Sequence, residues 1–218
     1  MALPFRDRSD AGRQLAARLG RYANRADVLV LALPRGGVPV AFEVAQALNA
    51  PLDVFLVRKL GVPGHEELAM GAIASGGVTF LNHDVLKSLH IPPKAVERVI
   101  ARERGELARR EQEYRGGTPA PDLRGRVAIL VDDGLATGAS MRAAIAAVRQ
   151  QAPRAIVVAA PVAPAGTCRE FQLLVDEVEC AETPAPFCAV GVWYDDFSQT
   201  TDAEIRDLLD RAAHAHLG

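Results

Sequence analysis

Two stretches of the chain repeat one pattern: an apolar run, a glycine-containing loop, apolar residues at helical spacing, and a second apolar run. The leading apolar runs are residues 28–33 and 127–131. Each is apolar throughout, which is typical of a strand that is buried on both faces. Buried strands that alternate with helices favour a parallel sheet covered on both sides. The sequence therefore predicts a doubly wound α/β fold with a mainly parallel sheet and helices on both faces.

The other elements of these two units are placed by their boundary residues. The first helix is expected to end at Asn49, before a strand at 54–57. The second helix is expected to precede a strand at 155–160. Near the start of the chain, apolar residues at helical spacing predict an opening helix with its cap at Ser9 or Asp10.

Residues 61–125 interrupt this alternation. They contain several glycines, a short β-like piece "VTFL", and a long charged helix from Pro93 to Gly116. A charged helix with a thin apolar stripe is usually exposed or forms one side of a subunit contact, so it is a candidate homodimer contact. We expect one domain over residues 1–218, in which 61–125 form a lid with a helical insertion and about 175–218 form a C-terminal hood and tail.

Charge and cysteine content narrow the class of protein. The net charge is −2 with both signs intermixed, so no broad surface for nucleic acid or anionic membrane is expected. Charged residues near the start and the lack of any apolar run of transmembrane length predict a cytoplasmic protein without a membrane partner. Cys168, Cys180 and Cys188 are odd in number and lack the paired spacing of a zinc site. We interpret them as buried thiols in a reducing cytoplasm.

The stretch "VAILVDDGLATGASM" places Asp132 and Asp133 directly after a buried strand. Burying two like charges costs free energy, so a ligand or a metal ion is the natural partner of this pair. In the loop behind them, backbone amides freed by Gly138, the hydroxyls of Thr137 and Ser140, and the dipole of the next helix suit a phosphate. The aspartates are expected to meet the neutral or cation-bound part of the same ligand, such as a ribose diol or Mg²⁺.

A second loop, "LPRGG", follows the first buried strand. Ligands of open parallel sheets bind outside the carboxyl ends of the strands, where both loops are expected. Arg35 supplies a fixed cation, and Gly36 and Gly37 permit close backbone approach to a second anionic group. "VRKLG" places Arg58 and Lys59 at the end of the neighbouring predicted strand. The sequence therefore predicts two anion sites and one acidic site along one sheet edge.

Several other motifs are excluded by single residues. A P-loop requires Lys before Ser or Thr after its second glycine, and "GLATGAS" has none; the G-x-G-x-x-G pattern of dinucleotide folds is also absent. "HEELA" lacks the second histidine of a zinc protease, because Ala69 stands in that position. A dehalogenase-like phosphatase would have two aspartates separated by one residue near the chain start, whereas these are adjacent and central.

The segment "ILVDDGLATGAS" resembles the defining motif of the type I phosphoribosyltransferases: an apolar strand, two acidic residues, and a short loop ending in T-G-x-[ST]. The resemblance covers roughly residues 28–160 and implies a site for 5-phosphoribosyl 1-pyrophosphate (PRPP) with Mg²⁺. Asp132 and Asp133 would contact the ribose 2- and 3-hydroxyls and help to organise the metal. The 5-phosphate would be held chiefly by backbone amides of the loop, at Ala136, Thr137, Gly138, Ala139 and Ser140.

The resemblance extends to the second loop, because "PRGG" is similar to the pyrophosphate loop of the family. That loop comprises Pro34, Arg35, Gly36 and Gly37, with the second and third nearest the leaving group. Arg58 and Lys59 resemble the additional pyrophosphate contacts. The catalytic residues that the resemblance implies are Asp132, Asp133, Arg58 and Lys59.

The segment "VGVWYDDF" is similar to the last strand and the following acidic turn of purine-type members. The resemblance implies that Trp193 or Tyr194 stacks on a base and that Asp195 or Asp196 serves the metal. A buried strand followed by an exposed acidic turn is an equally good interpretation, because aromatic residues commonly fill cores. A polar helix is expected from about Thr201.

The acceptor is not assigned by the motifs. Ala136 stands where 6-oxopurine enzymes of the family carry an acid, which disfavours hypoxanthine and guanine. Adenine enzymes have alanine there, and "VRKLG" is similar to theirs. Their catalytic glutamate precedes Y-G in a mobile loop, however, and the similar stretch here reads "LAMG", with Ala69 and Met70.

The resemblance implies a Mg²⁺-dependent transferase of nucleotide metabolism that moves the phosphoribosyl group of PRPP to a nitrogenous acceptor and releases pyrophosphate. Its transition state has oxocarbenium character, so it needs a neutralised leaving group, a fixed ribose and exclusion of water. The alternative is a non-catalytic regulator of the same fold that binds phosphoribosyl ligands. Ligand binding without pyrophosphate release would favour that alternative.

Overall fold

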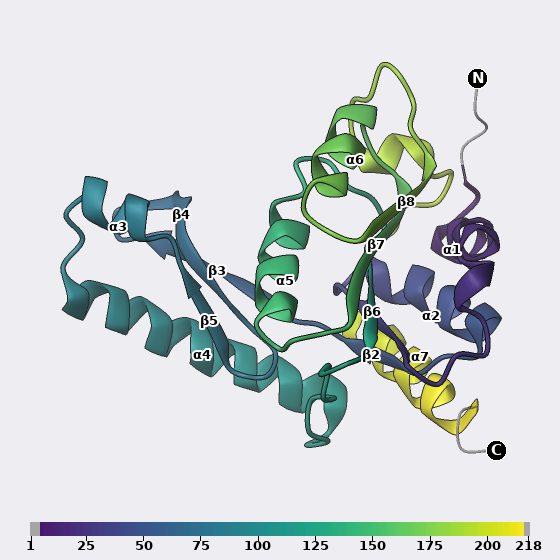
Figure 1. Cartoon of the computed structure of the whole chain (residues 1–218), viewed down its shortest axis with the longest axis horizontal. Helices are drawn as coiled ribbons and strands as arrows, with labels where there is room; N and C mark the ends of the chain where they lie inside the picture. Colours follow the sequence, from purple (N-terminus) through teal and green to yellow (C-terminus); the bar gives the residue numbers. More distant parts are fainter. Residues whose placement is uncertain (1–4, 216–218) are drawn as a thin grey trace.

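The computed structural model describes residues 5–215, and a five-stranded sheet lies at its centre (Figure 1). The strand order is β2 (Leu52–Val54), β1 (Val28–Ala32), β6 (Val127–Val131), β7 (Ala155–Val162) and β8 (Glu177–Glu182). Every pairing in this sheet is parallel. The chain continues from β1 to β2 on one side of the sheet and from β6 to β7 and β8 on the other side. A topological switch point therefore lies between β1 and β6.

Helices cover both faces of the sheet (Figure 1). α1 (Arg8–Arg18) and α2 (Gly37–Leu48) lie on one face, and α5 (Ala139–Arg149) and α6 (Ala165–Gln172) lie on the other. α7 (Asp202–Ala215) packs beside α2 and β2. The predicted α/β fold, with helices on both faces of a mainly parallel sheet, is confirmed.

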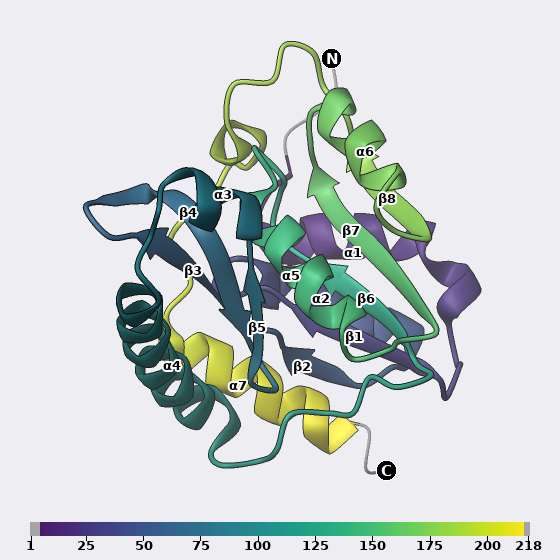
Figure 2. The same cartoon turned by 60° about the vertical axis from the view of Figure 1, so that its left-hand side comes forward.

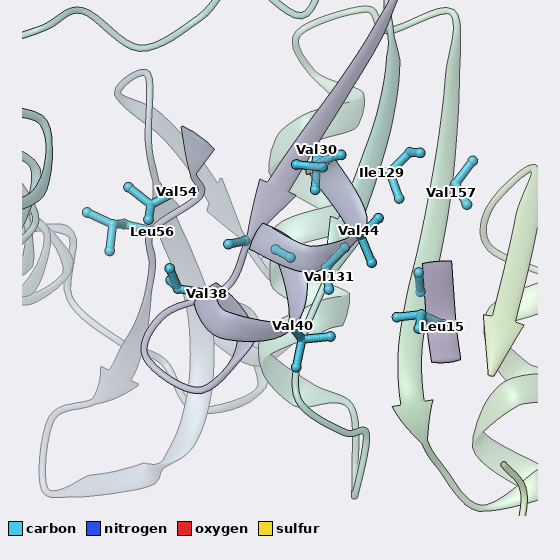
Figure 3. Packing of buried hydrophobic residues seen from close by; sticks show 14 of the residues in the cluster. Leu15, Val30, Val38, Val40, Val44, Val54, Leu56, Ile129, Val131 and Val157 are labelled. Atoms are coloured by element: carbon cyan, nitrogen blue, oxygen red, sulfur yellow. The ribbon is translucent and has the colours of Figure 1, made fainter. Parts of the chain in front are cut away.

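The alternation of side chains along β1 explains the two layers. Val28 and Val30 belong to the core under α1 and α2, whereas Leu29 and Leu31 belong to the core under α5 and α6. Figure 3 shows Val30 in the first core beside Val44 of α2. Because both faces are buried, each of these residues is apolar, and the strand reads as a continuous apolar run.

A separate three-stranded antiparallel sheet stands beside the central one (Figure 2). It is formed by β3 (Val57–Val62), β4 (His65–Ala74) and β5 (Val78–Leu81), and it is followed by α3 (His83–Ser88) and α4 (Pro93–Arg115). The predicted strand "VTFL" and the predicted long helix are confirmed. The ends of the predicted domain, residues 1–4 and 216–218, lie outside the described residues.

The strand predicted at 54–57 is wrong. The chain leaves the central sheet after Val54 and enters the antiparallel sheet at Val57, so two strands of different sheets share this apolar run. Arg58 and Lys59 consequently lie inside β3 and not at the end of a parallel strand. An apolar run alone gives no sign of where a chain changes sheets, because both sheets bury the same residue types.

Two further boundaries differ from expectation. The last strand is β8, and "AVGVWY" contains instead a short 3-10 helix, η2 (Val190–Trp193). β8 is an edge strand in which Glu177, Glu179 and Glu182 are half-buried, so it lacks the continuous apolar run of the inner strands. The cap of α1 is Asp7, whose carboxylate accepts a hydrogen bond from the Asp10 amide, and not Ser9 or Asp10.

The interpretation of the cysteines as buried thiols is wrong as well. Cys168 of α6 and Cys180 of β8 form a disulfide that joins this helix to the edge strand. Cys188 is free but exposed. The twelve-residue separation of the paired cysteines spans a helix and a turn, and sequence spacing does not show that they meet. In the described part of the chain, no helix combines the length and apolar character that a membrane crossing requires.

Candidate active site

The two aspartates that follow β6 face different surroundings. Asp132 lines a cavity of about 170 Å³ that is otherwise formed by the loop and first turn at residues 134–141. The carboxylate of Asp133 turns toward the start of α1, where its Oδ2 lies 2.9 Å from Nε of Arg8. One acid therefore faces the predicted phosphate loop, and the other is held by an arginine 125 residues away in the sequence.

The electrostatic state of this pair follows from its burial. Burial, and then the charge of Asp133, raises the pKa of Asp132 well above its ordinary value. Burial also raises the pKa of Asp133, although Arg8 opposes this rise. Within residues 5–215, Asp132 accepts a hydrogen bond from the Asp133 amide and forms no ion pair. Asp132 is thus a half-buried acid whose charged form a bound cation or hydroxyl would stabilise.

The phosphate loop is built by close contact with α6. Gly138 has φ of +68°, and a Cβ at this position would lie 2.6 Å from the ring of Phe171. The hydroxyl of Thr167 donates a hydrogen bond of 3.2 Å to the carbonyl of Ala136. α5 begins at Ala139, and the amides of its first turn lack intrahelical partners. These amides and the positive end of the helix lie where the sequence predicts an anion site.

The loop "PRGG" packs against the acidic loop, which begins with Asp132 and Asp133 after β6, at the switch point. A Cβ at Gly36 would lie 2.5 Å from the carboxyl carbon of Asp133, and one at Gly37 would lie 2.7 Å from the carbonyl oxygen of Val131. Only glycine therefore permits the approach of the two loops. Arg35 does not point freely into solvent, because its guanidinium lies 3.0 Å from a carboxylate oxygen of Asp202 at the start of α7.

A second cavity, of about 90 Å³, adjoins the first one. Its lining includes one residue from each of four predicted segments, namely Pro34, Arg58, Asp132 and Ser140. Asp132 and Ser140 line both cavities. The structure thus brings Asp132, the phosphate loop, Pro34 of "PRGG" and Arg58 of β3 to one place, whereas Arg35, Gly36 and Gly37 line neither cavity.

The two cations of "VRKLG" differ in their surroundings. Arg58 lines the second cavity, and its Nε and Nη2 both donate to one carboxylate oxygen of Glu103 on α4, at 2.9 and 2.7 Å. Lys59 is exposed and donates a hydrogen bond of 3.2 Å to the carbonyl of Glu67 across the β3–β4 hairpin. Arg58 is therefore fixed in the site, whereas Lys59 lies outside both cavities.

The C-terminal residues of the prediction do not enter either cavity. Tyr194 is buried, its ring packs between Phe5 and Phe197, and its hydroxyl donates to the carbonyl of Asp133 at 2.5 Å. Burial, and then the charge of Asp133, raises the pKa of Tyr194 above its ordinary value. Trp193 is partly buried and its indole nitrogen has no hydrogen-bond partner among the described residues. Tyr194 thus supports the Asp133 backbone and presents no open ring face.

The chain matches a known protein family over most of its length. The family described as "Phosphoribosyl transferase domain" matches residues 6–183, which include both loops and Arg58. The chain belongs to the phosphoribosyl transferase family. The match ends before Trp193, so Trp193, Tyr194, Asp195 and Asp196 lie outside the residues matched to the phosphoribosyl transferase family.

Individual phosphoribosyl transferase relatives agree with this assignment. Two proteins of Mycobacterium tuberculosis, MT0597 of strain CDC 1551 / Oshkosh and Rv0571c of strain ATCC 25618 / H37Rv, have names that assign them provisionally to the phosphoribosyl transferases. Each is 50% identical to the chain over 208 residues, which are 95% of the chain but 47% of the relative. The chain therefore spans about half the length of these relatives.

A solved structure is similar over nearly the whole phosphoribosyl transferase fold. TT1426 from Thermus thermophilus shares 43% sequence identity with the chain and has a TM-score of 0.83. The similarity covers 95% of this chain and 98% of that one. The antiparallel sheet and α4 therefore lie within a fold that another protein shares.

The carboxylate oxygens near the two cavities are suited to hold Mg²⁺ that binds together with a phosphorylated ligand. Mg²⁺ usually keeps several waters and is bound by one or two carboxylates together with substrate phosphates. In residues 5–215, no group of three or more His, Cys, Asp or Glu side chains forms a metal-binding cluster. Asp132 nevertheless offers a half-buried carboxylate, free of ion pairs among the described residues, on the wall shared by both cavities.

Asp195 and Asp196 do not join the acidic pair in a metal cluster of the described chain. Both are exposed, and their amides bond to carbonyls of Phe5 and Arg6. Asp196 lines a separate cavity of about 490 Å³ together with Arg8 and residues of α7. The segment similar to the family's acidic turn thus packs on the N-terminal segment and away from Asp132.

Three residues of the site were not identified from the sequence, namely Arg8, Glu103 and Arg110. Arg8 and Arg110 stand in charged helical segments, where each resembles an ordinary surface arginine. Glu103 carried a signal, because it interrupts an apolar stripe at helical spacing between Val99 and Leu107. A charge at such a position indicates a buried ionic partner.

Proposed function

We propose that this phosphoribosyl transferase moves the phosphoribosyl group of PRPP to a nitrogenous acceptor and releases pyrophosphate, with Mg²⁺ as cofactor. The observation that carries the proposal is the pair of adjoining cavities that share Asp132 and Ser140. One cavity is lined by the phosphate loop and the other by Pro34 and Arg58. PRPP has phosphate groups at both ends of a ribose, so it matches two anion sites separated by an acid.

Each part of PRPP has a proposed set of contacts. The 5-phosphate binds the amides of Ala136, Thr137, Gly138, Ala139 and Ser140. The ribose diol binds Asp132. Asp133 pairs with Arg8, and its backbone amide donates a hydrogen bond to Asp132, so it acts on the ribose indirectly through Asp132. The pyrophosphate binds the loop Pro34, Arg35, Gly36 and Gly37 together with Arg58 and, after movement of the hairpin, Lys59.

The proposed reaction breaks the bond between the anomeric carbon and the pyrophosphate oxygen and forms a bond to the acceptor nitrogen. The acceptor proton passes to solvent or to a base that is not assigned. Mg²⁺ would neutralise charge on the departing pyrophosphate. Arg58 adds a fixed cation on the leaving-group side, and it costs little reorganisation because Glu103 already holds it in place.

The β3–β4 hairpin is the proposed lid. Residues 63–69 at its tip are exposed, and Lys59 bonds to its other strand through the Glu67 carbonyl. A hairpin that is anchored at Arg58 and exposed at its tip can move over the second cavity without disturbing the core. Closure would exclude water from the sugar cation and bring Lys59 to the pyrophosphate.

The acceptor is proposed only as a nitrogen nucleophile, because Tyr194 offers no open ring face in the described structure. Trp193 keeps its place as a proposed base contact, since its indole nitrogen is without a partner among the described residues. A homodimer contact through α4, the lid and hood boundaries, and a cytoplasmic location stay predictions from the sequence.

Measurement of pyrophosphate release tests the proposed function. The protein is incubated with PRPP, Mg²⁺ and a panel of nucleobases and amines, and pyrophosphate is quantified. We expect release that depends on one acceptor class and on Mg²⁺. Tight Mg²⁺-dependent binding of PRPP without release for any acceptor would instead support a regulator of the same fold. Failure to bind PRPP at all would overturn both.

A further inference from the structure

The wall of the second cavity includes one residue of α4, Arg110. Its side chain is about one-third exposed, and Nε donates a hydrogen bond of 3.0 Å to Glu106, one turn earlier. Arg58 of β3, in the antiparallel sheet, lines the same cavity. Two arginines thus line one small cavity in which Asp132 is the only acidic lining residue within residues 5–215.

Residues on one face of α4 hold the cations of this site. Glu103 binds Arg58 with two hydrogen bonds, and its side chain is only 8% exposed. Tyr114 donates a hydrogen bond of 2.6 Å to the Asp202 carboxylate, whose other oxygen lies 3.0 Å from Arg35. Positions 103, 106, 110 and 114 follow each other at spacings of three or four, which places them along one helix face.

We propose that Arg110 is a ligand-binding residue, a further cation for the pyrophosphate group of PRPP in addition to Arg35, Arg58 and Lys59. This inference rests on the proposed function, and it assigns the site a contact from α4. Arg58 and Arg110 each pair with a carboxylate of α4, Glu103 and Glu106, but neither glutamate lines the cavity, so an anion bound there would meet two positively charged side chains. A guanidinium is always charged and can bind a phosphate group through two nitrogens at once.

The simpler explanation is that Arg110 serves only as a surface partner of Glu106. Helical pairs four residues apart are common and contribute only a few tenths of a kcal/mol. Arg109 provides the comparison, because it binds the same Glu106 at 2.9 Å, is more exposed, and does not line the cavity. A surface role would make the two arginines equivalent, whereas a ligand role would separate them.

The test compares Arg110→Gln, Arg110→Lys and the matched control Arg109→Gln. Calorimetric titrations with Mg²⁺ measure the affinity for three probes: PRPP, inorganic pyrophosphate and ribose 5-phosphate. We expect Arg110→Gln to weaken binding of PRPP and pyrophosphate by about tenfold or more, the range for hydrogen bonds to charged groups. Binding of ribose 5-phosphate should not change. Arg110→Lys should restore part of the affinity, and Arg109→Gln should resemble the unchanged protein.

The control measurements separate the possible failures. Thermal unfolding of each variant shows whether α4 still packs. If a folded Arg110→Gln protein binds all three probes as Arg109→Gln does, Arg110 is only a surface residue and the inference is wrong. If Arg110→Gln weakens all three probes equally, the arginine acts on the fold of the site and a pyrophosphate contact is excluded. If the unchanged protein binds pyrophosphate but not PRPP, the proposed function fails, and the pyrophosphate comparison still decides Arg110.

Discussion

The carboxylate of Asp133 fills the space in which residue 36 would carry a side chain, so Asp133 and Gly36 are matched across the switch point. A Cβ on Gly36 would also lie 3.1 Å from Nε of Arg8, the partner of this carboxylate. The acidic loop, "PRGG" and the start of α1 therefore pack closely together at the position where residue 36 would carry a Cβ. Any side chain at position 36 must displace an ion pair that is mostly buried.

Replacement of Gly36 tests this relationship. Gly36→Ala should displace Asp133 and weaken PRPP binding by about tenfold or more, because contacts to charged groups are lost. Calorimetry with Mg²⁺ measures the affinity. Gly105→Ala is the control, since nothing lies within 4 Å of a Cβ at that helical position. The control should raise the free energy of unfolding by about 0.5–1 kcal/mol and leave binding intact. Equal affinity of Gly36→Ala and the unchanged protein would show that the gap is not needed.

The phosphate loop provides a second test at Gly138. Alanine there would adopt a left-handed conformation and press on the ring of Phe171. We expect Gly138→Ala to lower the free energy of unfolding by about 1–3 kcal/mol, the usual cost of such a backbone. Binding of ribose 5-phosphate, measured by calorimetry, should fall below detection. Gly166→Ala in α6, where a Cβ meets nothing within 4 Å, should bind normally. Normal binding by Gly138→Ala would rule out this loop as the phosphate site.

The ion pair between Glu103 and Arg58 predicts a pH dependence. Burial alone would raise the pKa of Glu103, but the hydrogen bonds from Arg58 and Arg102 outweigh it, and the pKa lies below its ordinary value. The carboxylate therefore stabilises the fold above the pKa of the unfolded chain, about 4.3, and this stability is lost as the pH falls through the lower folded pKa.

Glu103→Gln should accordingly lower the free energy of unfolding at pH 7 by about 1–3 kcal/mol. The difference from the unchanged protein should shrink as the pH falls below about 4, where the unfolded carboxylate becomes protonated. Urea unfolding at a series of pH values measures both quantities. Glu97→Gln, an exposed site on the same helix, is the control. A difference that stays constant from about pH 7 to about pH 3 would exclude the ionic explanation.

Replacement of Asp132 by asparagine should raise the stability of the ligand-free protein. Burial raises the pKa of this carboxyl group, so its charged form at pH 7 costs stability. Asp132→Asn keeps an oxygen for the Asp133 amide and removes the charge. We expect a melting temperature several degrees higher, equivalent to about 1–2 kcal/mol for a chain of this size. Scanning calorimetry without ligand measures it, and a lower melting temperature would mean that the charge is already compensated within the protein.

Much of the fold could be predicted from the sequence because the inner strands are buried on both faces. The runs at 28–33 and 127–131 are apolar at every position, so their strands and the helices that follow them, α2 and α5, could be placed from the sequence. The edge strand β8 and the change of sheet after Val54 were not, because half-buried strands and chain crossings leave no distinct apolar pattern.

The site divides in the same way. Loops that follow inner strands could be placed at one sheet edge, because parallel strands end together, and Asp132, Ser140 and Pro34 do meet there. The contacts of Arg8 and Arg110 depend on how α1 and α4 pack against that edge. A charged residue on an exposed helix carries no local sign of a partner far away in sequence, and only the three-dimensional structure reveals it.

The role of Asp132 in binding the sugar is tested most directly by the affinity for PRPP of the unchanged protein, Asp132→Asn and the exposed control Asp210→Asn, measured by titration calorimetry with and without Mg²⁺. We predict Mg²⁺-dependent binding by the unchanged protein and by Asp210→Asn, and an affinity about tenfold lower or weaker still for Asp132→Asn. If Asp132→Asn binds PRPP as tightly as the unchanged protein, the acid shared by the two cavities does not hold the sugar, and the proposed PRPP site is wrong.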